Sequence, residues 1–443
     1  MSLTALGVGA GARLAGNLAQ RAFADSEKKT QLNLKYLTDQ AAILAQELGQ
    51  LKGSVMKVGQ MLSMYGEHFL PPEANRLLKS LQNESPPVVW DEMRKVLVSE
   101  LGEDKLQKLE IKREAFASAS LGQVHLATEK ATGLKLALKI QYPGVDQAID
   151  SDLKTLKRLL SLSRLVPADY NLDEIFAEVE MILSQEVDYT KEKEWTQVFR
   201  ERLKDDKRYI IPQVFDDYSS SKVLATSFEE GINLDHPRVL ALSQERRNRL
   251  GENFLELYLR EIFQWGEVQT DPHFGNYRVR LNESGEDQLI LLDFGAVRRF
   301  DQAFLEKYYK MSGGAHRKNQ ELLESGVNAL GFLRPGDSEE HRRLFYDICV
   351  AITEPFQKDK LKEGVYDWGK SDLPQRLLAR TGEVLRAFKL RPPPREIIFL
   401  DRKLGGVFVA LSRLGAKTNS IPILESYLGA ALNRVGVGGQ KGT

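Results

Sequence analysis

Cysteine is almost absent from this chain: Cys349 is the single one among 443 residues. One thiol cannot build a disulfide framework, which favours a reducing compartment and leaves no disulfide partner within the chain. The residues on both sides of Cys349 are apolar, as in Ile-Cys-Val. We therefore expect Cys349 to be a small core residue and not a nucleophile.

Long hydrophobic runs are missing too. No stretch of about twenty apolar residues occurs, so the sequence predicts no membrane-spanning helix. The segment Leu3 to Ala24 is rich in Ala and Gly, but no basic residue precedes it and Arg13 and Arg21 interrupt it. We therefore do not interpret it as a secretory signal, and we do not expect secretion. A helix lying on a membrane surface, a packing helix and a loosely ordered N-terminus all remain open.

An excess of charge of either sign is also lacking, since Lys plus Arg and Asp plus Glu each number 62. Nucleic-acid binding generally requires a basic face, so we expect no nucleic-acid partner. The six histidines are scattered and show no zinc-ligand spacing. With 42% apolar residues, the chain is long enough for two or three domains or subdomains with a substantial core.

The most informative stretch runs from Thr270 to Gly295. Asp271 and Asn276 stand five residues apart, the spacing of the catalytic Asp and the metal-binding Asn in a protein-kinase catalytic loop. Asp293, followed by Phe and Gly, closes an apolar run that is typical of a buried strand. Carboxylate and amide oxygens are the hard ligands that Mg²⁺ prefers beside phosphates. The stretch therefore predicts a nucleotide and metal site on a strand–turn–strand hairpin.

A strand-rich region precedes this stretch. Apolar residues alternate from Leu134 to Tyr142, which places Lys139 on the opposite face of a predicted strand. Such a lysine is usually only solvated, but here it follows a turn of small residues, Ala117 to Leu121, at the distance between a kinase phosphate loop and its strand lysine. We expect five strands: Leu109–Lys112, Gly122–Thr128, Leu134–Tyr142, Tyr209–Val214 and Lys222–Phe228.

Two predicted helices carry further polar candidates. The first covers residues 32–66 and places Lys57 and Gln60 on one face, where both could also be merely solvated. The second runs from Leu172 to Leu203. Glu186 and Glu192 are therefore expected to lie about 120° apart around its axis and to offer carboxylates to two neighbouring sides.

Six motifs in order resemble the UbiB family of atypical kinases, the aarF-domain kinase-like proteins, and most closely its ubiquinone-biosynthesis branch. They are Lys57-Val-Gly-Gln60, Ala117-Ser-Ala-Ser120, Leu136-Ala-Leu-Lys139, Glu186-Val-Asp188, Asp271-Pro-His-Phe-Gly-Asn276 and Asp293-Phe-Gly295. The stretch from Leu400 to Phe408 supports the assignment to that branch. The resemblance covers roughly residues 32–430 and implies an α+β, bilobal protein-kinase-like fold with a helical N-terminal extension packed over the active site.

The resemblance divides the chain into five parts. These are an Ala/Gly-rich segment that is a candidate for membrane contact (1–31), a helical extension (32–107), a kinase-like N-lobe (108–228), a kinase-like C-lobe (229–435) and a disordered tail (436–443).

The resemblance also implies residue roles and cofactors, ATP or ADP with Mg²⁺. Lys139 is expected to hold the phosphates and to pair with Glu192. Lys57 is expected to reach the active site and to pair with Glu186. The remaining roles are a phosphate loop at Ala117, Ser118, Ala119 and Ser120, a nucleotide contact at Gln60, a catalytic acid at Asp271 and metal ligands at Asn276 and Asp293.

Three positions depart from the family pattern. Ser118 replaces a loop alanine, Phe274 stands where proline is usual, and Ser227 with Phe228 occupies the region between the lobes where a glutamate is common. None of these departures affects a phosphate or metal role. The last leaves the adenine-recognition residues undefined.

Three functions follow from these expectations. The first is an ATPase of kinase-like fold that supports isoprenoid-quinone biosynthesis or lipid handling, with quinone-biosynthesis proteins or a lipid or phenol-like molecule as partners. It would act peripherally at a membrane, on the cytoplasmic or organelle-matrix side. The second is a nucleotide-binding scaffold without catalysis. The third is a protein or small-molecule kinase, which is disfavoured for protein substrates because no long activation segment with Ala-Pro-Glu follows Gly295.

Overall fold

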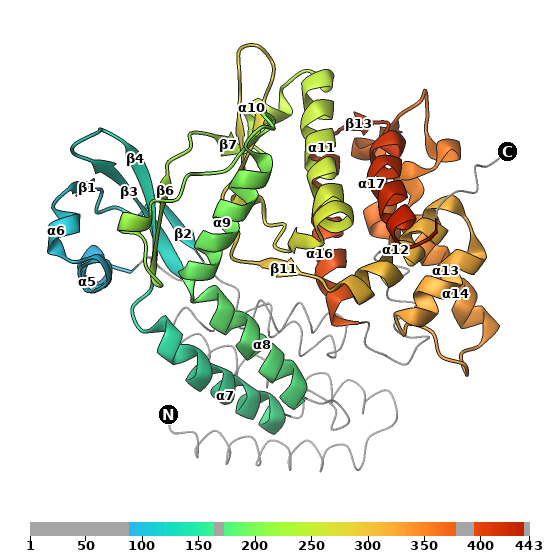
Figure 1. Cartoon of the computed structure of the whole chain (residues 1–443), viewed down its shortest axis with the longest axis horizontal. Helices are drawn as coiled ribbons and strands as arrows, with labels where there is room; N and C mark the ends of the chain where they lie inside the picture. The colour runs from blue at the N-terminus through green and yellow to red at the C-terminus, as the bar shows by residue number, and fades with distance from the viewer. Residues whose placement is uncertain (1–87, 120, 164–171, 378–393, 438–443) are drawn as a thin grey trace, which may run out of the picture. The chain divides into compact units, whose positions relative to one another are not determined.

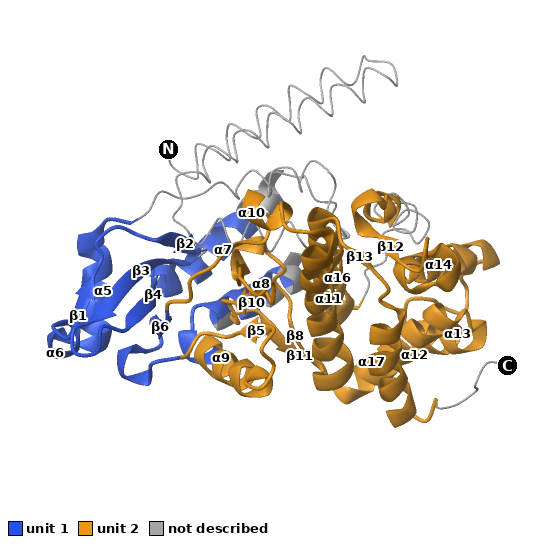
Figure 2. Cartoon of the chain, turned by 90° about the horizontal axis from the view of Figure 1, so that it is seen from above, with its two compact units in different colours: residues 1–191, 214–227 blue, residues 192–213, 228–443 orange. Residues whose placement is uncertain are grey.

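The computed structural model describes residues 88–119, 121–163, 172–377 and 394–437. The chain divides into two compact units (Figure 2). The N-terminal unit extends to Lys191 and includes Val214–Ser227, and the C-terminal unit consists of Glu192–Gln213 and the chain from Phe228 onward. The predicted helix over residues 32–66 lies outside the described residues.

A five-stranded antiparallel sheet forms the centre of the N-terminal unit (Figure 1). Its strands are β1 (Leu109–Ile111), β2 (Ala117–Ala119), β3 (Gly122–Glu129), β4 (Lys135–Gln141) and β6 (Val223–Ser227). The order is β1-β3-β4-β6, with β2 paired to β3. The alternating residues Leu136, Leu138 and Ile140 of β4 are fully buried in a core shared with helix α5 (Trp90–Leu101). The strand predicted around Lys139 is therefore confirmed.

The membership of this sheet differs from the prediction in two places. Residues 117–119, predicted as a turn, form β2, because Ala117 pairs with Val124 and Ala119 with Gly122. The segment Tyr209–Val214 was expected to be one of the five strands of this sheet, but β5 (Tyr209–Ile210) pairs in parallel with β10 (Gln288–Leu291) of the C-terminal unit. Strand pairing depends on a partner distant in the sequence, which a local pattern does not reveal.

The predicted continuous helix from Leu172 to Leu203 is wrong. The chain forms α8 (Leu172–Glu186) and α9 (Tyr189–Leu203), separated at Val187 and Asp188. The Asp188 carboxylate accepts hydrogen bonds from the Thr190 N–H (3.1 Å) and hydroxyl (2.5 Å), a local bonding pattern that competes with helix continuation. Glu186 and Glu192 therefore lie on different helices, and the 120° relation does not apply. Among the described residues of this unit, the other helical elements are α6 (Glu103–Leu106), α7 (Val145–Ser163) and η1 (Asp216–Tyr218).

Three small sheets lie in the C-terminal unit. The largest has the order β5-β10-β9-β7, and its hairpin of β9 and β10 carries the candidate metal ligands. The other two pair β11 with β8 and β12 with β13. Their strands are β7 (Ile232–Asn233), β8 (Glu267–Gln269), β9 (Tyr277–Arg280), β11 (Val297–Arg299), β12 (Tyr366–Asp367) and β13 (Lys417–Thr418).

Helices make up most of the C-terminal unit (Figure 1). Where this unit is described, they are α10 (Pro237–Leu240), α11 (Gln244–Leu259), the π-helix η2 (Arg260–Trp265), η3 (Phe274–Asn276), α12 (Gln302–Arg317), α13 (Gln320–Ala329), α14 (Glu339–Ile352), η4 (Glu354–Phe356), η5 (Lys358–Lys360), η6 (Trp368–Lys370), α16 (Arg395–Leu414) and α17 (Ile421–Arg434). Asp301 caps α12 as predicted, since its carboxylate accepts from the Phe304 N–H at 2.7 Å. Cys349 is buried in the core of α13 and α14, as expected, and burial raises the pKa of its thiol.

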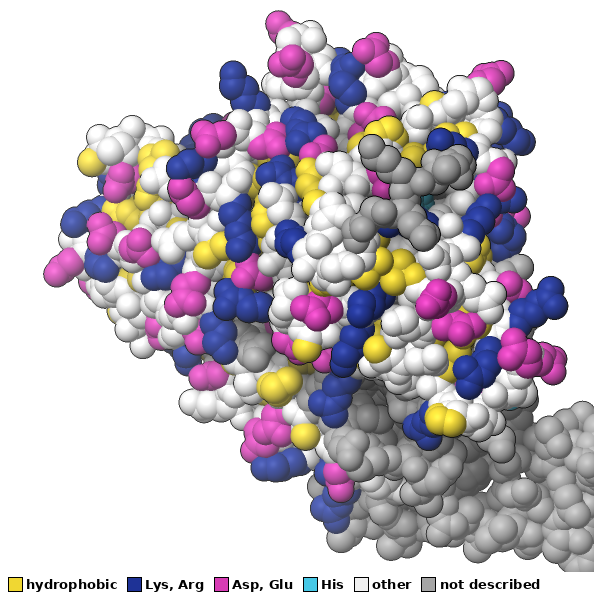
Figure 3. Space-filling view, turned by 45° about the vertical axis from the view of Figure 1, so that its right-hand side comes forward, with side chains coloured by type: hydrophobic (Ala, Val, Ile, Leu, Met, Phe, Trp, Pro, Cys, Tyr) yellow, Lys and Arg dark blue, Asp and Glu magenta, His cyan; other side chains and the backbone are white. Residues whose placement is uncertain are grey.

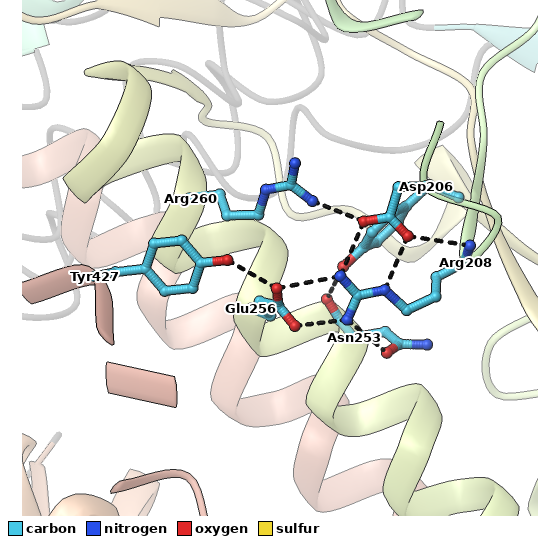
Figure 4. A network of polar contacts seen from close by, with 7 residues as sticks. Asp206, Arg208, Asn253, Glu256, Arg260 and Tyr427 are labelled. Carbon is cyan, nitrogen blue, oxygen red and sulfur yellow. Dashed lines mark hydrogen bonds and ion pairs between the residues drawn. The ribbon is translucent and has the colours of Figure 1, made fainter. Parts of the chain in front are cut away.

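An ion-pair network joins the segment between α9 and β5 to α11, η2 and α17 (Figure 4). Arg208 donates to Asp206 and Glu256, and Arg260 donates to the same Asp206 at 2.8 Å. The Tyr427 hydroxyl completes the network by donating to Glu256 at 2.8 Å. On the face shown in Figure 3, by contrast, acidic and basic side chains are interspersed, in keeping with the balanced net charge.

Candidate functional site

The hairpin of β9 and β10 brings two of the predicted metal ligands to the same end. Tyr277 pairs with Leu291, and the next residue, Leu292, donates its N–H to the Asn276 carbonyl at 3.0 Å. Asn276 and Asp293 are therefore placed next to one another, just beyond the last paired residues of the hairpin. The register brings both residues to one end of the hairpin, and a shared metal site there stays a prediction.

Asp271 is held at the same end by hydrogen bonds to both sides of its carboxylate. The Asn276 side-chain amide donates to Oδ2 of Asp271 at 3.2 Å and to its carbonyl at the same distance. The guanidinium of Arg402 donates to Oδ1 at 2.6 Å. The Asp271 N–H donates to the Gln269 side chain at 2.9 Å, which fixes the backbone of the loop as well.

Arg402 is a site residue that the sequence analysis missed. It lies on α16, which packs beside α11 (Figure 1), and reaches across 131 residues of sequence to Asp271. Its neighbour one turn later, Gly406, packs so closely on Pro272 that an added Cβ would lie 2.1 Å from the proline ring. Arg402 lies within the stretch Leu400 to Phe408 that supports the family branch, but its residue type alone does not indicate a contact with Asp271.

The segment after β10 is held by helix α9. Phe294 is 1% exposed and packs on Phe199 of that helix, with the ring centroids 4.8 Å apart. The Gly295 N–H donates to Oδ1 of Asp293 at 2.9 Å. A carboxylate oxygen of the buried Glu192 lies only 3.2 Å from where a Cβ on Gly295 would stand. Glu192 is thus beside the Asp293 segment, within the C-terminal unit.

The donor set at this end fits a magnesium ion. Donation from Nδ2 of Asn276 to Asp271 orients the amide, which leaves its carbonyl oxygen as the group available to a cation. Asp293 supplies a carboxylate, and both residues are only partly buried. Oxygen ligands of this kind are those that Mg²⁺ takes when it is bound together with substrate phosphates. Asn276 and Asp293 could therefore hold the metal, with Asp271 beside them.

The N-terminal unit contains the predicted phosphate-binding residues. Ala117, Ser118 and Ala119 lie on β2 next to the turn into β3, and Ser120 lies outside the described residues. Lys139 pairs across the sheet with Val124 and Leu224, and its ammonium lies 5.1 Å from the centroid of the Tyr189 ring. These contacts place the lysine on the sheet.

Several predicted relations remain predictions. Lys139 and Glu192 belong to different compact units, so their pairing is not tested. Glu186 ends α8 and is half-buried, while its expected partner Lys57 lies outside the described residues, as does Gln60.

Comparison with known proteins gives consistent matches over most of the chain. A family model described as the ABC1 atypical kinase-like domain matches residues 80–325. The mitochondrial atypical kinase COQ8 of Saccharomyces cerevisiae is 33% identical over 383 residues, covering 86% of this chain and 75% of that protein. The mitochondrial atypical kinase COQ8 of Schizosaccharomyces pombe is 31% identical over 387 residues, covering 87% of this chain and 62% of that protein.

A solved structure is similar as well. Rv3197 of Mycobacterium tuberculosis, described in complex with erythromycin, has a TM-score of 0.61 and 26% sequence identity. The match covers 90% of this chain and 98% of that one.

Proposed function

This chain belongs to the ABC1 atypical kinase-like family, and from that premise we propose that it is a Mg-ATP-dependent enzyme that hydrolyses ATP in support of isoprenoid-quinone (ubiquinone) biosynthesis or lipid handling at a membrane surface. The family resemblance and the kinase-like α+β fold expected from the sequence are confirmed. The observation that carries the proposal is the convergence of Asp271, Asn276 and Asp293 at one end of the β9–β10 hairpin.

In this proposal the chain supplies positioned charges and little covalent chemistry, as is usual for phosphoryl transfer. Asn276 and Asp293 hold Mg²⁺, which when bound neutralises charge on the phosphates. Asp271 orients the attacking hydroxyl or water, and its own orientation is set by Arg402 and Asn276. Lys139 binds the phosphates and is kept in place by Glu192, while Ala117, Ser118, Ala119 and Ser120 form the phosphate loop.

The N-terminal extension completes the proposed site. In this proposal Lys57, which is not among the described residues, contacts the nucleotide, and the carboxylate of Glu186 balances its charge. Gln60 lies one turn further along the same predicted helix. ADP and ATP both bind in this arrangement. Contacts to the adenine ring stay unassigned.

The segment after Gly295 favours ATP hydrolysis over phosphorylation of a peptide. It forms β11, which pairs with β8, and α12 begins at Gln302, only seven residues after Gly295. A protein kinase needs a longer activation segment to dock a peptide. The second candidate function, a nucleotide-binding scaffold, would use the same residues without turnover.

Contact with a membrane is proposed to be peripheral and to involve Leu3 to Ala24, which lies outside the described residues. Over the described part of the chain, no helix is both long enough and apolar enough to cross a bilayer. Quinone-biosynthesis proteins, a lipid or a phenol-like compound are the proposed partners, on the cytoplasmic or organelle-matrix side.

The test is phosphate release from the purified full-length chain with Mg-ATP. It is measured with and without liposomes and with and without a phenol that mimics a quinone head group, and EDTA provides the metal-free control. Mg-dependent release that rises with liposomes or phenol supports the proposal. Mg-dependent nucleotide binding without release under any condition would instead establish the scaffold.

A further inference from the structure

A buried ion pair lies beneath the candidate site. The ammonium of Lys403 on α16 lies 3.2 Å from a carboxylate oxygen of Glu261 on η2, and the two side chains are each 2% exposed. Burial raises the pKa of Glu261 to about 7, and the nearby Lys403 opposes that rise. Pairs of this kind are costly to desolvate, and apolar residues of similar volume often give equal or greater stability. Stability alone therefore does not explain why a charged pair occupies this position.

The pair is connected to each of the three segments that carry the proposed chemistry. On one side, Lys403 donates to the Tyr277 hydroxyl at 3.0 Å. Tyr277 directly follows Asn276 and is itself 3% exposed, so its position constrains the metal-binding amide.

On the other side, η2 lies against β8, and the backbone of Gln269 on that strand lowers the pKa of the Glu261 carboxyl. The buried side chain of Gln269 then bonds in two directions. Its oxygen accepts from the Asp271 N–H at 2.9 Å, and its amide donates to the Asp293 carbonyl at 3.2 Å. One side chain thus bridges the backbones of the proposed catalytic and metal-binding aspartates.

The backbone beneath Glu261 is also unusual. Arg260–Trp265 is a π-helix at the end of α11, and such turns occur frequently at functional sites. All these residues belong to the C-terminal unit, so their contacts lie within one compact body.

We propose that Lys403, Glu261 and Gln269 form a positioning cluster that sets the mutual placement of Asp271, Asn276 and Asp293, and thereby the affinity of the site for Mg²⁺ in the presence of ATP. This inference rests on the proposed Mg-ATP function. None of the three residues touches the reacting atoms; each acts through the backbone or through a neighbouring side chain.

The test separates positioning from stability by replacing the pair in two steps. Lys403→Met leaves Glu261 buried without its cation and should lower the Tm strongly. The double variant Glu261→Gln/Lys403→Met retains a side-chain acceptor beside β8 and removes both charges, so its Tm should return close to that of the parent. The readout is the Mg²⁺ concentration that gives half-maximal ATP binding, measured beside metal-free nucleotide binding.

We expect the double variant to need about 10- to 100-fold more Mg²⁺ than the parent, the usual effect of removing a group that orients metal ligands, with metal-free nucleotide binding unchanged. Gln269→Leu, which leaves the pair intact, should show the same rise. Glu354→Gln is the matched control. Glu354 lies on η4, outside the cluster, and the change weakens its ion pair with Arg376. It should lower the Tm without changing the Mg²⁺ requirement.

Different results would contradict the positioning role and the proposed function. Suppose that the parent binds ATP in a Mg-dependent way, and that the double variant and Gln269→Leu need no more Mg²⁺ than the parent does. The positioning role is then wrong, and the proposed function stands. If the parent shows no Mg-dependent ATP binding, the proposed function fails and this inference fails with it.

Discussion

The guanidinium of Arg402 donates to Oδ1 of Asp271 at 2.6 Å, while the side-chain amide of Asn276 donates to Oδ2 at 3.2 Å. Both oxygens of the proposed catalytic carboxylate are thus engaged, one by a cation from α16 and one by a proposed metal ligand. A carboxylate held in this way keeps one orientation, which is a requirement for aligning an attacking oxygen.

Arg402→Ala should lower kcat for ATP hydrolysis by about 10- to 100-fold, because a small misplacement of a catalytic group has effects of that size. The affinity for Mg-ATP should change much less, since Asn276 and Asp293 remain. Arg402→Lys should give a kcat between those of the parent and Arg402→Ala, because lysine keeps the charge but not the planar donor geometry. Steady-state kinetics test this, with Arg413→Ala, at an exposed position on the same helix, as control. Equal kcat in the parent and Arg402→Ala would contradict the role.

Asp293→Asn should abolish Mg-dependent nucleotide binding and leave the fold intact. An amide is a weaker ligand than a carboxylate, and without the metal the phosphates would face the remaining acidic groups unshielded. The measurement is the rise in Tm on adding Mg-ATP. Glu283→Gln removes an exposed carboxylate at the far end of the same hairpin and should behave like the parent. An equal thermal shift in Asp293→Asn would show that this carboxylate is not a ligand.

Lys57→Ala should alter nucleotide affinity and turnover sharply while leaving the Tm without ligand almost unchanged. A lysine that serves only solubility can be replaced at a cost within about 0.5 kcal/mol and without functional effect. The matched control is Lys52→Ala, a nearby lysine with no proposed role. If both variants behave like the parent, the N-terminal extension does not contribute to the site.

Asp206→Asn should destabilise the protein at neutral pH by about 1–3 kcal/mol, because Arg208 and Arg260 lose a charged acceptor. Hydrogen bonding from Arg208 lowers the pKa of Asp206 below its ordinary value of 3.8. The stabilisation from this group is therefore present above that value and is lost as the pH falls through the lower, folded-state pKa.

The gap in unfolding free energy between the parent and Asp206→Asn should accordingly shrink below a pH of 3.8. Urea unfolding over a pH series measures it. Asp205→Asn, at the exposed neighbouring position, is the control. A gap that stays constant with pH would argue that Asp206 is not ionised in this network.

Gly314→Ala should destabilise the C-terminal unit by about 1–3 kcal/mol through overpacking. A Cβ at Gly314 would lie 2.2 Å from the backbone nitrogen of Leu323, where α12 packs against α13. Gly429→Ala on α17 meets only a carboxylate oxygen at 3.8 Å and should be neutral, or stabilising by about 0.5–1 kcal/mol. Urea midpoints compare the two, and an unchanged midpoint for Gly314→Ala would mean that the helices can separate at little cost.

Local patterns in the sequence predicted much of the N-terminal sheet and part of the site. Alternation identified the strand of Lys139, because one face of that strand is buried against α5. The spacing of Asp271, Asn276 and Asp293 indicated that these residues come together at a hairpin, because a tight strand–turn–strand fixes which residues meet. Both features depend on residues close in the sequence.

The structural features that the sequence did not predict depend on residues far apart in the chain or on local backbone geometry. The break at Asp188 takes only two residues and leaves the apolar periodicity on both sides unchanged. β5 pairs with β10, about eighty residues later in the sequence. Arg402 and Asp271 form a hydrogen bond although 131 residues separate them in the sequence. Gln269 immediately precedes the stretch from Thr270 to Gly295, yet its residue type does not indicate that it bridges two backbones.

The π-helical turn at Arg260–Trp265 has a consequence for how chains of this kind can vary in length. A turn with i→i+5 hydrogen bonds accommodates more residues than an α-helical turn of about 3.6, so losing one residue there would restore α-helical geometry while α11 and β8 keep nearly the same places. The side chains within the turn, Glu261 among them, would change direction relative to Lys403. An alignment gap within Arg260–Gly266 therefore bears on the proposed positioning cluster, whereas a gap in the hairpin turn near Ser284 does not.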